Sequence, residues 1–385
     1  MKILSVCYED MSGSIGGVRQ VIEIGEHLMR RNHRVEVSVA GIGKYRQKTD
    51  LKINYVPTVN IRILRPLVYH LLSFFHILVT CLVFKPDIIL TYEIFFSFTP
   101  LAIAKIIGRP HVLFVNGDIE DFKIKNYPGP ALFFIDTLRK INLKFSTRII
   151  TVSEQLKEMI CDKYQILSEK IDLVHNGVDI TEFKPMDRNT ACKKLGLNAD
   201  TFHIGFLGGL FSWHGLDCLV RSAPLVLSRY PKTKFIIAGH GPMKEKLISL
   251  AEESKVKESF IFTAQVPFDL VPFYINSFDI CIVFFKPVRK NSGNPVKMFE
   301  YLACAKPIVA SKQGGYGDFV EELQAGQGVD IFNQKEVAQA IISLKENEQL
   351  RADMAERARK AAVDKYSWDK VVQMLEDVFS KLISK

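Results

Sequence analysis

The chain has 385 residues, of which 48% are hydrophobic, and its 51 Lys and Arg against 42 Asp and Glu give a formal net charge of +9. This length exceeds what one hydrophobic core usually supports, so we expect two domains of ordinary size. The seven cysteines form no CxxC pair and no metal-ligand spacing, which argues against a cysteine-based metal site and indicates reduced core thiols in a cytoplasmic protein. The first residues, MKILSVCYED, lack the pattern of a signal peptide, so secretion is not expected.

The first half of the chain alternates short apolar runs with helical patterns. A strand at residues 1–8 is followed by a glycine-containing loop, a helix and a strand at 35–40. The pattern then predicts strands at 87–91, 111–115, 148–152 and 171–175, with helices at 97–107, 130–145 and 153–163. This alternation predicts a parallel, doubly wound sheet covered by helices.

Glycines lie where the first strand turns into the first helix. Gly13, Gly16 and Gly17 precede that helix, and glycines at such a turn let backbone amides approach a phosphate closely. The spacing is not GxGxxG and no acidic residue ends the second strand, which argues against an NAD or FAD site. Two interpretations remain: the amides of Gly16 and Gly17 contact the phosphates of a nucleotide, or the loop needs glycine only for positive φ.

A basic segment precedes a long apolar one. Six cations and one carboxylate lie between Lys44 and Arg65, and residues 67–84 (LVYHLLSFFHILVTCLVF) carry no formal charge. Residues 67–84 fit a buried helix of a Rossmann-like domain, a helix partly exposed for membrane docking, or a membrane span at the bottom of the length range. Docking predicts a peripheral contact of residues 44–84 with an anionic membrane. Nucleic acid is not expected as a partner, because the basic segment lacks interleaved aromatic residues.

A polar turn, Asn116-Gly117-Asp118, follows the strand at 111–115. Ligands of such folds bind at the carboxyl ends of the strands. We therefore take Asn116 and Gly117 as candidate acceptor-binding residues and Asp118 as a candidate catalytic residue, with a plain turn as the alternative.

A second alternating pattern follows His175-Asn176-Gly177-Val178-Asp179 and a connector at 180–200. It predicts strands at 203–208, 234–238, 259–262 and 279–284 and helices at 215–229, 243–254 and 269–275. The final amphipathic pattern, 366–385, predicts a helix that returns to cover the first domain. We expect a first domain at 1–178, a second at 179–363 and a crossing helix at 364–385, with a ligand cleft between the two domains.

The stretch 291–310, NSGNPVKMFEYLACAKPIVA, predicts a polar loop, a helix at 296–303 and a strand at 308–310. Lys297 and Glu300 are three residues apart, so they share one helical face near the N-terminus, where unpaired amides and the helix dipole attract anions. The pattern indicates a nucleoside diphosphate site with Lys297 near phosphate and Glu300 accepting hydrogen bonds from ribose. A surface lysine and a capping glutamate are the alternative.

Several stretches together resemble the retaining GT-B glycosyltransferases of family four. They are GGVRQ at 16–20, TVSEQLKEMI at 151–160, HNGVDITEFKP at 175–185, GFLGGLFSWHG at 205–215, AGHGPMKEKL at 238–247, and KMFEYLACAKPIVAS at 297–311 followed by Gly314-Gly315. The resemblance implies two Rossmann-like domains, a sugar-nucleotide donor held mainly by the second and an acceptor held mainly by the first. It also implies retention at the anomeric carbon without a bound metal or other cofactor.

The sequence departs from the family pattern at charged positions. The family typically offers an Arg and a Lys to the diphosphate where this chain has Gly209 and His214, and the first of its paired glutamates is replaced by Ser292, leaving Glu300. A subgroup with a Trp-His-Gly run and a Lys-x-x-Glu-Tyr run is similar, and its Lys corresponds to Lys297. We infer that Lys297 supplies the positive charge that binds the diphosphate, with His214, neutral or charged, as a second hydrogen-bond donor to it.

The remaining donor candidates come from two loops. The loop before the helix at 296–303 is expected to lie against the donor sugar through its amides, and its candidates are Ser292, Gly293, Asn294, Pro295 and Val296. His240 and Gly241 follow the strand at 234–238 and are expected to reach the base or ribose, with a turn histidine as the alternative.

These observations predict a retaining, metal-independent hexosyltransferase that moves a sugar from a nucleoside-diphosphate sugar to a hydroxyl of a glycan or lipid-linked acceptor, in cell-surface polysaccharide or glycolipid assembly. The sequence shows no obvious covalent nucleophile. Retention therefore fits front-face attack, in which the acceptor approaches on the same face as the leaving phosphate. A GT-B sugar-nucleotide epimerase is one alternative. A catalytically inactive nucleotide-sugar-binding subunit is another, motivated by Gly209 and Ser292. The expected location is the cytoplasm, at the inner face of the cell membrane if residues 67–84 dock there.

Overall fold

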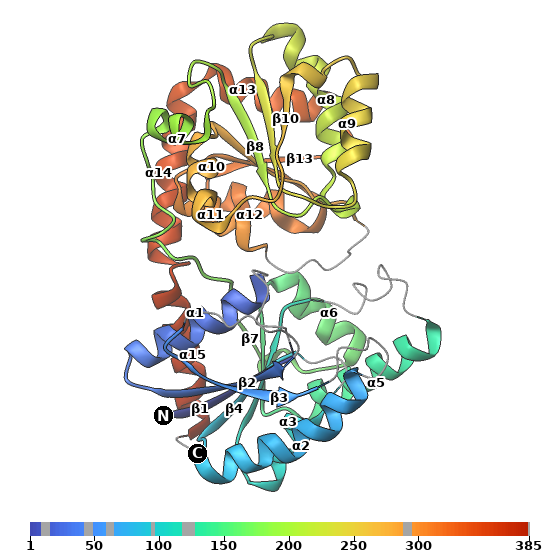
Figure 1. Cartoon of the computed structure of the whole chain (residues 1–385), viewed down its shortest axis with the longest axis vertical. Helices are drawn as coiled ribbons and strands as arrows, with labels where there is room; N and C mark the ends of the chain where they lie inside the picture. The colour runs from blue at the N-terminus through green and yellow to red at the C-terminus, as the bar shows by residue number, and fades with distance from the viewer. Residues whose placement is uncertain are drawn as a thin grey trace. The chain divides into compact units, whose positions relative to one another are not determined.

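The computed structural model describes residues 1–8, 16–41, 49–58, 65–93, 97–117, 128–287 and 295–383. The chain divides into two compact units (Figure 1). Unit 1 contains Met1–Gly177 and the C-terminal segment from Trp368, and unit 2 contains the residues from Val178 to Ser367 apart from a short loop before Pro295.

Unit 1 is built on a parallel sheet with the strand order β3-β2-β1-β4-β5-β6-β7. Its strands are β1 (Lys2–Cys7), β2 (Arg34–Gly41), β3 (Lys52–Pro57), β4 (Ile88–Tyr92), β5 (His111–Val115), β6 (Arg148–Thr151) and β7 (Ile171–Leu173). Its helices are α1 (Gly16–Arg30), α2 (Arg65–Phe84), α3 (Thr99–Ile106), α5 (Gly129–Phe145), α6 (Glu154–Tyr164) and α15 (Trp368–Ile383). Every residue of β4 and β5 is buried, as expected for central strands covered on both faces.

The helices of unit 1 pack in two hydrophobic clusters. Side chains of α1, α6 and α15 share one cluster with the sheet, and side chains of α2 and α3 share another. Glu376 ties α15 to the rest of the unit, because its carboxylate accepts hydrogen bonds from Arg31 Nε and His33 Nε2, each at 2.6 Å.

Unit 2 repeats the architecture on a second parallel sheet, with the order β10-β9-β8-β11-β12-β13. Its strands are β8 (His203–Leu207), β9 (Lys234–Ala238), β10 (Phe260–Phe262), β11 (Ile280–Val283), β12 (Ile308–Ser311) and β13 (Gly326–Val329). Its helices are α7 (Arg188–Leu195), α8 (Leu216–Arg229), α9 (Lys244–Glu253), α10 (Val271–Ser277), α11 (Val296–Ala303), α12 (Tyr316–Glu322), α13 (Gln334–Glu346) and α14 (Glu348–Asp364). The predicted fold class, two doubly wound parallel-sheet domains, is confirmed.

Two of the elements that the sequence analysis did not assign are α7 and β3. The connector at 180–200 contains α7, which Asp187 caps by accepting a hydrogen bond from the Thr190 amide, and which ends at Gly196 with φ +67°. The basic segment contains β3, an edge strand whose Lys52 and Asn54 both donate to the Glu36 carboxylate of β2. Part of the basic charge therefore supports strand pairing inside unit 1.

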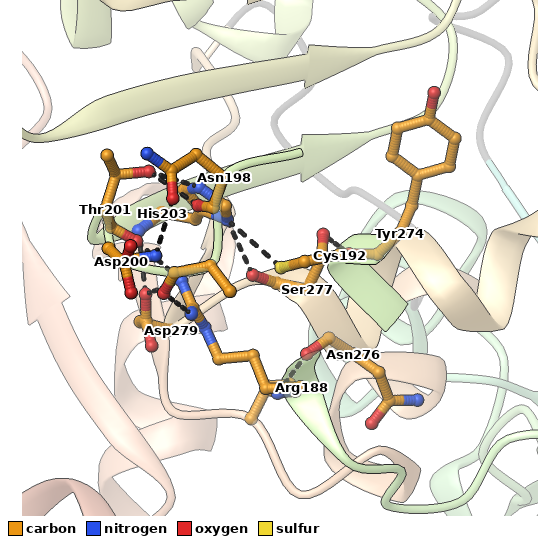
Figure 2. A network of polar contacts seen from close by, with 12 residues as sticks. Arg188, Cys192, Asn198, Asp200, Thr201, His203, Tyr274, Asn276, Ser277 and Asp279 are labelled. Carbon is orange, nitrogen blue, oxygen red and sulfur yellow. Dashed lines mark hydrogen bonds and ion pairs between the residues drawn. The ribbon is translucent and has the colours of Figure 1, made fainter. Parts of the chain in front are cut away.

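A polar network fixes α7 to the amino ends of β8 and β11 (Figure 2). One carboxylate oxygen of Asp279 accepts from the His203 amide at 2.7 Å and from Arg188 at 2.9 Å. Arg188 also donates to the carbonyls of Ala199 and Thr201, and His203 Nδ1 donates to the Ser277 carbonyl. Burial lowers the pKa of His203, which suits a neutral ring in this network. The network lies at the strand ends opposite those that carry the candidate ligand loops, so its role is structural.

Among the described residues, no helix is both long and apolar enough to cross a membrane.

Candidate functional site

The candidate donor site of unit 2 lies at the carboxyl ends of β8 and β9, where two loops are joined backbone to backbone. The Gly208 amide donates to the Ala238 carbonyl at 2.9 Å, and the Leu210 amide donates to the His240 carbonyl at 3.0 Å. Met243 in turn donates to the Leu210 carbonyl at 3.0 Å. The loop after β8 is therefore held in place by the loop that carries His240 and Gly241.

Helix α11 is attached to the same loop by Tyr301. The fully buried phenol oxygen accepts a hydrogen bond from the Leu207 amide at 2.8 Å, at the last residue of β8. Burial raises the pKa of Tyr301 well above its usual value, so the group stays a neutral phenol. This contact fixes the position of the N-terminal turn of α11, and hence of Lys297, relative to Gly208 and Gly209.

Lys297 is the second residue of α11, and Pro295 before the helix supplies no side-chain cap. Part of the side chain is exposed, but its ammonium nitrogen is buried and has no hydrogen-bond partner within the described residues. The nitrogen lies 4.0 Å from the centroid of the Phe206 ring, a cation–π contact. It would also lie 2.6 Å from a Cβ at Gly208, whose φ of +142° further disfavours any other residue. Gly208 thus leaves room for the ammonium group.

Burial lowers the pKa of Lys297 to about 7, and the Glu300 carboxylate opposes part of this shift. Glu300 lies on the same helix and is 8% exposed. A buried ammonium that lacks a hydrogen-bond acceptor costs several kcal/mol, because it loses its hydration. An anion bound beside Lys297 and the first amides of α11 would remove that cost, so the geometry fits a phosphate ligand.

His214 lies within the 3-10 turn Ser212–His214, and its ring centroid is 5.4 Å from that of Phe206. Its Nδ1 is 2.6 Å from the Gly209 carbonyl oxygen, which only accepts, so Nδ1 carries a proton. In a neutral ring Nε2 is then an acceptor, and His214 donates through Nε2 only as an imidazolium. His214 can therefore donate a hydrogen bond to phosphate, the predicted role, only in its charged form.

Gly209 occupies a position where the family resemblance leads one to expect arginine. A Cβ at Gly209 would lie 2.5 Å from the Phe211 ring. That ring stacks on Trp213 with centroids 4.5 Å apart and planes 6° from parallel. An aromatic pair therefore fills the space beside Gly209, and the buried cation at this site comes from Lys297 instead.

The candidates of unit 1 belong to a separate polar cluster. Asn116 Nδ2 donates to Gln20 Oε1 at 2.6 Å, and Gln20 Nε2 donates to Asn176 Oδ1 at 2.5 Å. Gly16 and Gly17 are the first residues of α1, the helix that carries Gln20. Helix α1, the turn after β5 and the His175-Asn176-Gly177 stretch thus meet through their side chains.

Gly117 is held by a buried ion pair. Its carbonyl accepts a hydrogen bond from Arg139 at 2.8 Å, and Arg139 Nε lies 2.9 Å from the Glu93 carboxylate. Both charged side chains are almost completely buried. Asp118, Ser292, Gly293 and Asn294 lie outside the described residues.

Sequence reasoning missed several residues that shape these sites: Phe206, Gly208, Tyr301, Gln20, Asn176, Arg139 and Glu93. Most lie within the motifs quoted above, so their positions carried a signal although no role had been assigned to them. The Arg139–Glu93 pair had no such signal, because its partners are far apart in the sequence. Within the described ranges, no group of three or more His, Cys, Asp or Glu is placed to hold a metal ion.

Two family models match the chain. Residues 15–182 match the model described as Glycosyltransferase Family 4, and residues 187–361 match the model described as Glycosyl transferases group 1. An uncharacterised glycosyltransferase of Methanocaldococcus jannaschii is 24% identical over 98% of this chain and 98% of that protein. The capsular polysaccharide biosynthesis glycosyltransferase CapM of Staphylococcus aureus is 25% identical over 69% of this chain and 70% of that protein.

Solved structures share the fold. Sucrose-phosphate synthase from Thermosynechococcus elongatus superposes with a TM-score of 0.80 at 14% identity, covering 100% of both chains. Anabaena HepE in complex with UDP has a TM-score of 0.76 at 19% identity over 99% of this chain and 100% of that one, and its complex with UDP-glucose has a TM-score of 0.75. The two family matches follow one another along the chain and together cover most of it, so the chain belongs to the group 1, family 4 glycosyltransferases with the GT-B fold.

Proposed function

We propose that this glycosyltransferase moves a hexosyl group from a nucleoside-diphosphate sugar to a hydroxyl of a glycan or lipid-linked acceptor, with retention and without a metal ion. The observation that carries the donor assignment is the Lys297 ammonium group, which is buried beside Gly208 and the first turn of α11 without a hydrogen-bond acceptor among the described residues. The diphosphate would supply that acceptor.

In this proposal each candidate of unit 2 contacts a different part of the donor. Lys297 and the imidazolium of His214 bind the diphosphate, and Glu300 accepts hydrogen bonds from the ribose hydroxyls. His240 and Gly241 contact the base or ribose. The loop that ends in Pro295 and Val296, with Ser292, Gly293 and Asn294, contacts the donor sugar.

Unit 1 supplies the acceptor-binding residues. Asn116 and Gly117 bind the acceptor, with Asp118 beside the reacting hydroxyl. The amides of Gly16 and Gly17 at the start of α1 donate further hydrogen bonds to phosphate. The Arg139–Glu93 pair supports this role because it holds the Gly117 carbonyl, and with it the turn, in one position.

The proposed reaction breaks the bond between the anomeric carbon and the phosphate oxygen and forms a bond from that carbon to the acceptor oxygen on the same face. The acceptor proton passes to the departing phosphate oxygen. Negative charge grows on the phosphate as the bond breaks, so cationic donors already aimed at it lower the barrier most. One such donor is worth about 10²–10³ in turnover.

The comparisons support the donor and acceptor classes indirectly. HepE has been crystallised with UDP and UDP-glucose, and CapM is named for capsular polysaccharide biosynthesis. We propose a role in cell-surface polysaccharide or glycolipid assembly, and the uncharged run at 68–84 motivates the proposal that the enzyme acts as a peripheral protein at the inner face of the cell membrane.

A panel of sugar nucleotides tests the donor assignment. A ligand that binds only the folded state at 100 times its Kd adds about 2.7 kcal/mol to stability, so the true donor should raise Tm by several degrees. Lys297→Met should abolish the shift, whereas Lys232→Met, an exposed lysine of unit 2, should keep it. No shift with any nucleoside diphosphate or its sugar would contradict the donor site.

Product analysis separates the proposal from its alternatives. Transfer with an unchanged anomeric configuration in NMR spectra, and in the presence of EDTA, is the expected result. An epimerised sugar nucleotide formed without acceptor would indicate an epimerase. Tight binding with no transfer to extracted lipids or glycans would indicate an inactive subunit.

A further inference from the structure

Helix α2 has an apolar side chain on nearly every face. The row Tyr69, Ser73, Ile77 and Cys81 is buried against the sheet. On an ordinary surface helix the opposite row is polar. Here it consists of large apolar side chains, which we call the α2 surface: Leu71 (63% exposed), Leu72 (38%), Phe75 (61%), Val79 (58%), Leu82 (61%) and Val83 (77%).

Neighbouring helices also expose large apolar side chains. Helix α3 packs against α2 and exposes Ile106. Helix α5 adjoins the start of α3, because Asn142 Nδ2 donates to the Ser97 carbonyl at 3.0 Å, and it exposes Phe133, Phe134 and Phe145. Figure 1 shows α2, α3 and α5 following one another along unit 1. Scattered exposed apolar residues need no explanation, but a concentration of this kind marks an interaction surface.

The charged residues around the α2 surface have one dominant sign. Residues 68–84 of α2 include no Lys, Arg, Asp or Glu, and Lys85, Lys105, Arg109, Lys140 and Lys144 are exposed on the described part of the segment from α2 to α5. The two carboxylates nearest these cations in sequence are both engaged. Asp136 pairs with Lys163 at 3.2 Å, and Asp87 accepts from the Lys2 amide at 2.8 Å. The exposed charges on the described part of the segment from α2 to α5 are therefore predominantly positive.

We propose that the α2 surface lies on an anionic lipid bilayer, with the α2 axis parallel to the membrane plane and the cations of α3 and α5 against the headgroups. Apolar side chains that enter the interface, flanked by lysine and arginine, are the two features that hold a helix on such a membrane. A second copy of the chain is a poorer occupant. A twofold contact through this surface would bring the exposed cations of the same segment from each copy together.

This inference deepens the proposed membrane location and rests on that part of the proposed function, but not on the transfer reaction. It also divides α2 between two roles. One row of its side chains is buried in the core of unit 1, and in this proposal the exposed row contacts lipid. Docking through unit 1 would bring the unit that is proposed to bind the acceptor close to lipid-linked substrates.

Co-sedimentation of the full-length protein with vesicles tests the proposal. Vesicles of phosphatidylcholine with phosphatidylglycerol should bind the protein, and vesicles of phosphatidylcholine alone should bind it less. Binding to the anionic vesicles should weaken between 0.05 and 0.5 M salt, because only the electrostatic part is screened. The triple variant Leu71→Gln/Phe75→Gln/Val79→Gln should bind at least about tenfold more weakly, because three large side chains no longer enter the interface.

Matched controls exclude general effects of these substitutions. Phe332→Gln replaces an aromatic residue that is 55% exposed in unit 2 and should leave vesicle binding unchanged. Lys105→Gln/Lys140→Gln should weaken binding at low salt only. Lys232→Gln/Lys246→Gln, which removes the same charge from unit 2, should have little effect.

Two results would overturn the proposal. One is vesicle binding by the triple variant that equals the wild type. The other is a wild-type dimer in light scattering that becomes monomeric in the triple variant while neither binds vesicles, which would assign the surface to a second copy. Transfer to a water-soluble acceptor should be the same in the triple variant and the wild type, with an unchanged Tm. If neither the wild type nor the triple variant transferred sugar while the wild type still bound vesicles, the result would count against the proposed reaction and not against membrane docking.

Discussion

Binding of the donor should be accompanied by proton uptake, because burial holds the pKa of Lys297 at about 7 in the protein without ligand. A diphosphate beside the ammonium group would return that pKa toward its usual value of 10.5. At pH 8 roughly one tenth of the free protein carries the proton and nearly all of the complex does, so binding should take up ~0.9 proton. At pH 6 the uptake should fall to ~0.1, and donor affinity should fall about fivefold from pH 7 to 8 and about tenfold from pH 8 to 9.

Calorimetry in buffers with different ionisation enthalpies measures this uptake directly. The ligand should be the intact sugar nucleotide, since a free nucleoside diphosphate ends in a phosphate monoester that itself titrates near pH 6. Lys297→Met should bind weakly and should take up ~0.9 proton less than the wild type at pH 8, and any uptake that remains belongs to the charged form of His214. Lys232→Met should behave as the wild type. A difference in uptake below ~0.2 proton at pH 8 between the wild type and Lys297→Met would refute the argument, because it would mean that Lys297 is already charged or does not meet the phosphate.

The same group makes the stability of the free protein depend on pH. The folded-state pKa of Lys297 is lowered, so the unfolded chain binds more protons between about pH 7 and pH 10.5. Across that window Lys297 makes the free energy of unfolding rise with pH, by up to about 1.4 kcal/mol per unit, and below pH 7 the full cost of burying the charge remains. Chemical denaturation at pH 7.5 and pH 9 should show this rise in the wild type but a smaller one in Lys297→Met.

Four further substitutions test other contacts. Glu300→Gln should weaken nucleotide binding about tenfold with little change in turnover at saturation, and unchanged affinity in calorimetry would argue against the ribose role. Gly208→Ala should lower donor affinity at least about tenfold because its Cβ would displace the Lys297 ammonium, whereas Gly196→Ala, whose Cβ meets open space, should alter only stability. His214→Phe keeps the aromatic packing but leaves the Gly209 carbonyl without its hydrogen bond, so we expect a loss of about 1–3 kcal/mol in the free energy of unfolding together with lower turnover. Glu376→Gln should lower that free energy by about 1 kcal/mol in denaturant titrations, and no change would mean that α15 is held by its apolar face alone.

Local patterns in the sequence were sufficient for most of the fold. Helix α11 and strand β5 have the predicted bounds, because helical and strand periodicity depend on residues close in sequence. Helix α7 was missed although Asp187 and Gly196 mark its ends, since its short polar pattern resembles a connector. Strand β3 was missed because the segment that contains it is marked by charge, while the backbone of β3 pairs with β2, a strand outside that segment.

The chemistry of the site depended on contacts that no local pattern contains. The sequence by itself determined that a lysine and a glutamate share one face at the start of α11, and that glycines end β8. Only the tertiary structure decided that the Lys297 ammonium is buried against Phe206 and Gly208, and that the Phe211 ring fills the space beside Gly209. The physical reason is that hydrophobic periodicity shows which residues face a core, whereas a pKa near 7 arises from water excluded by segments that meet only when the chain has folded.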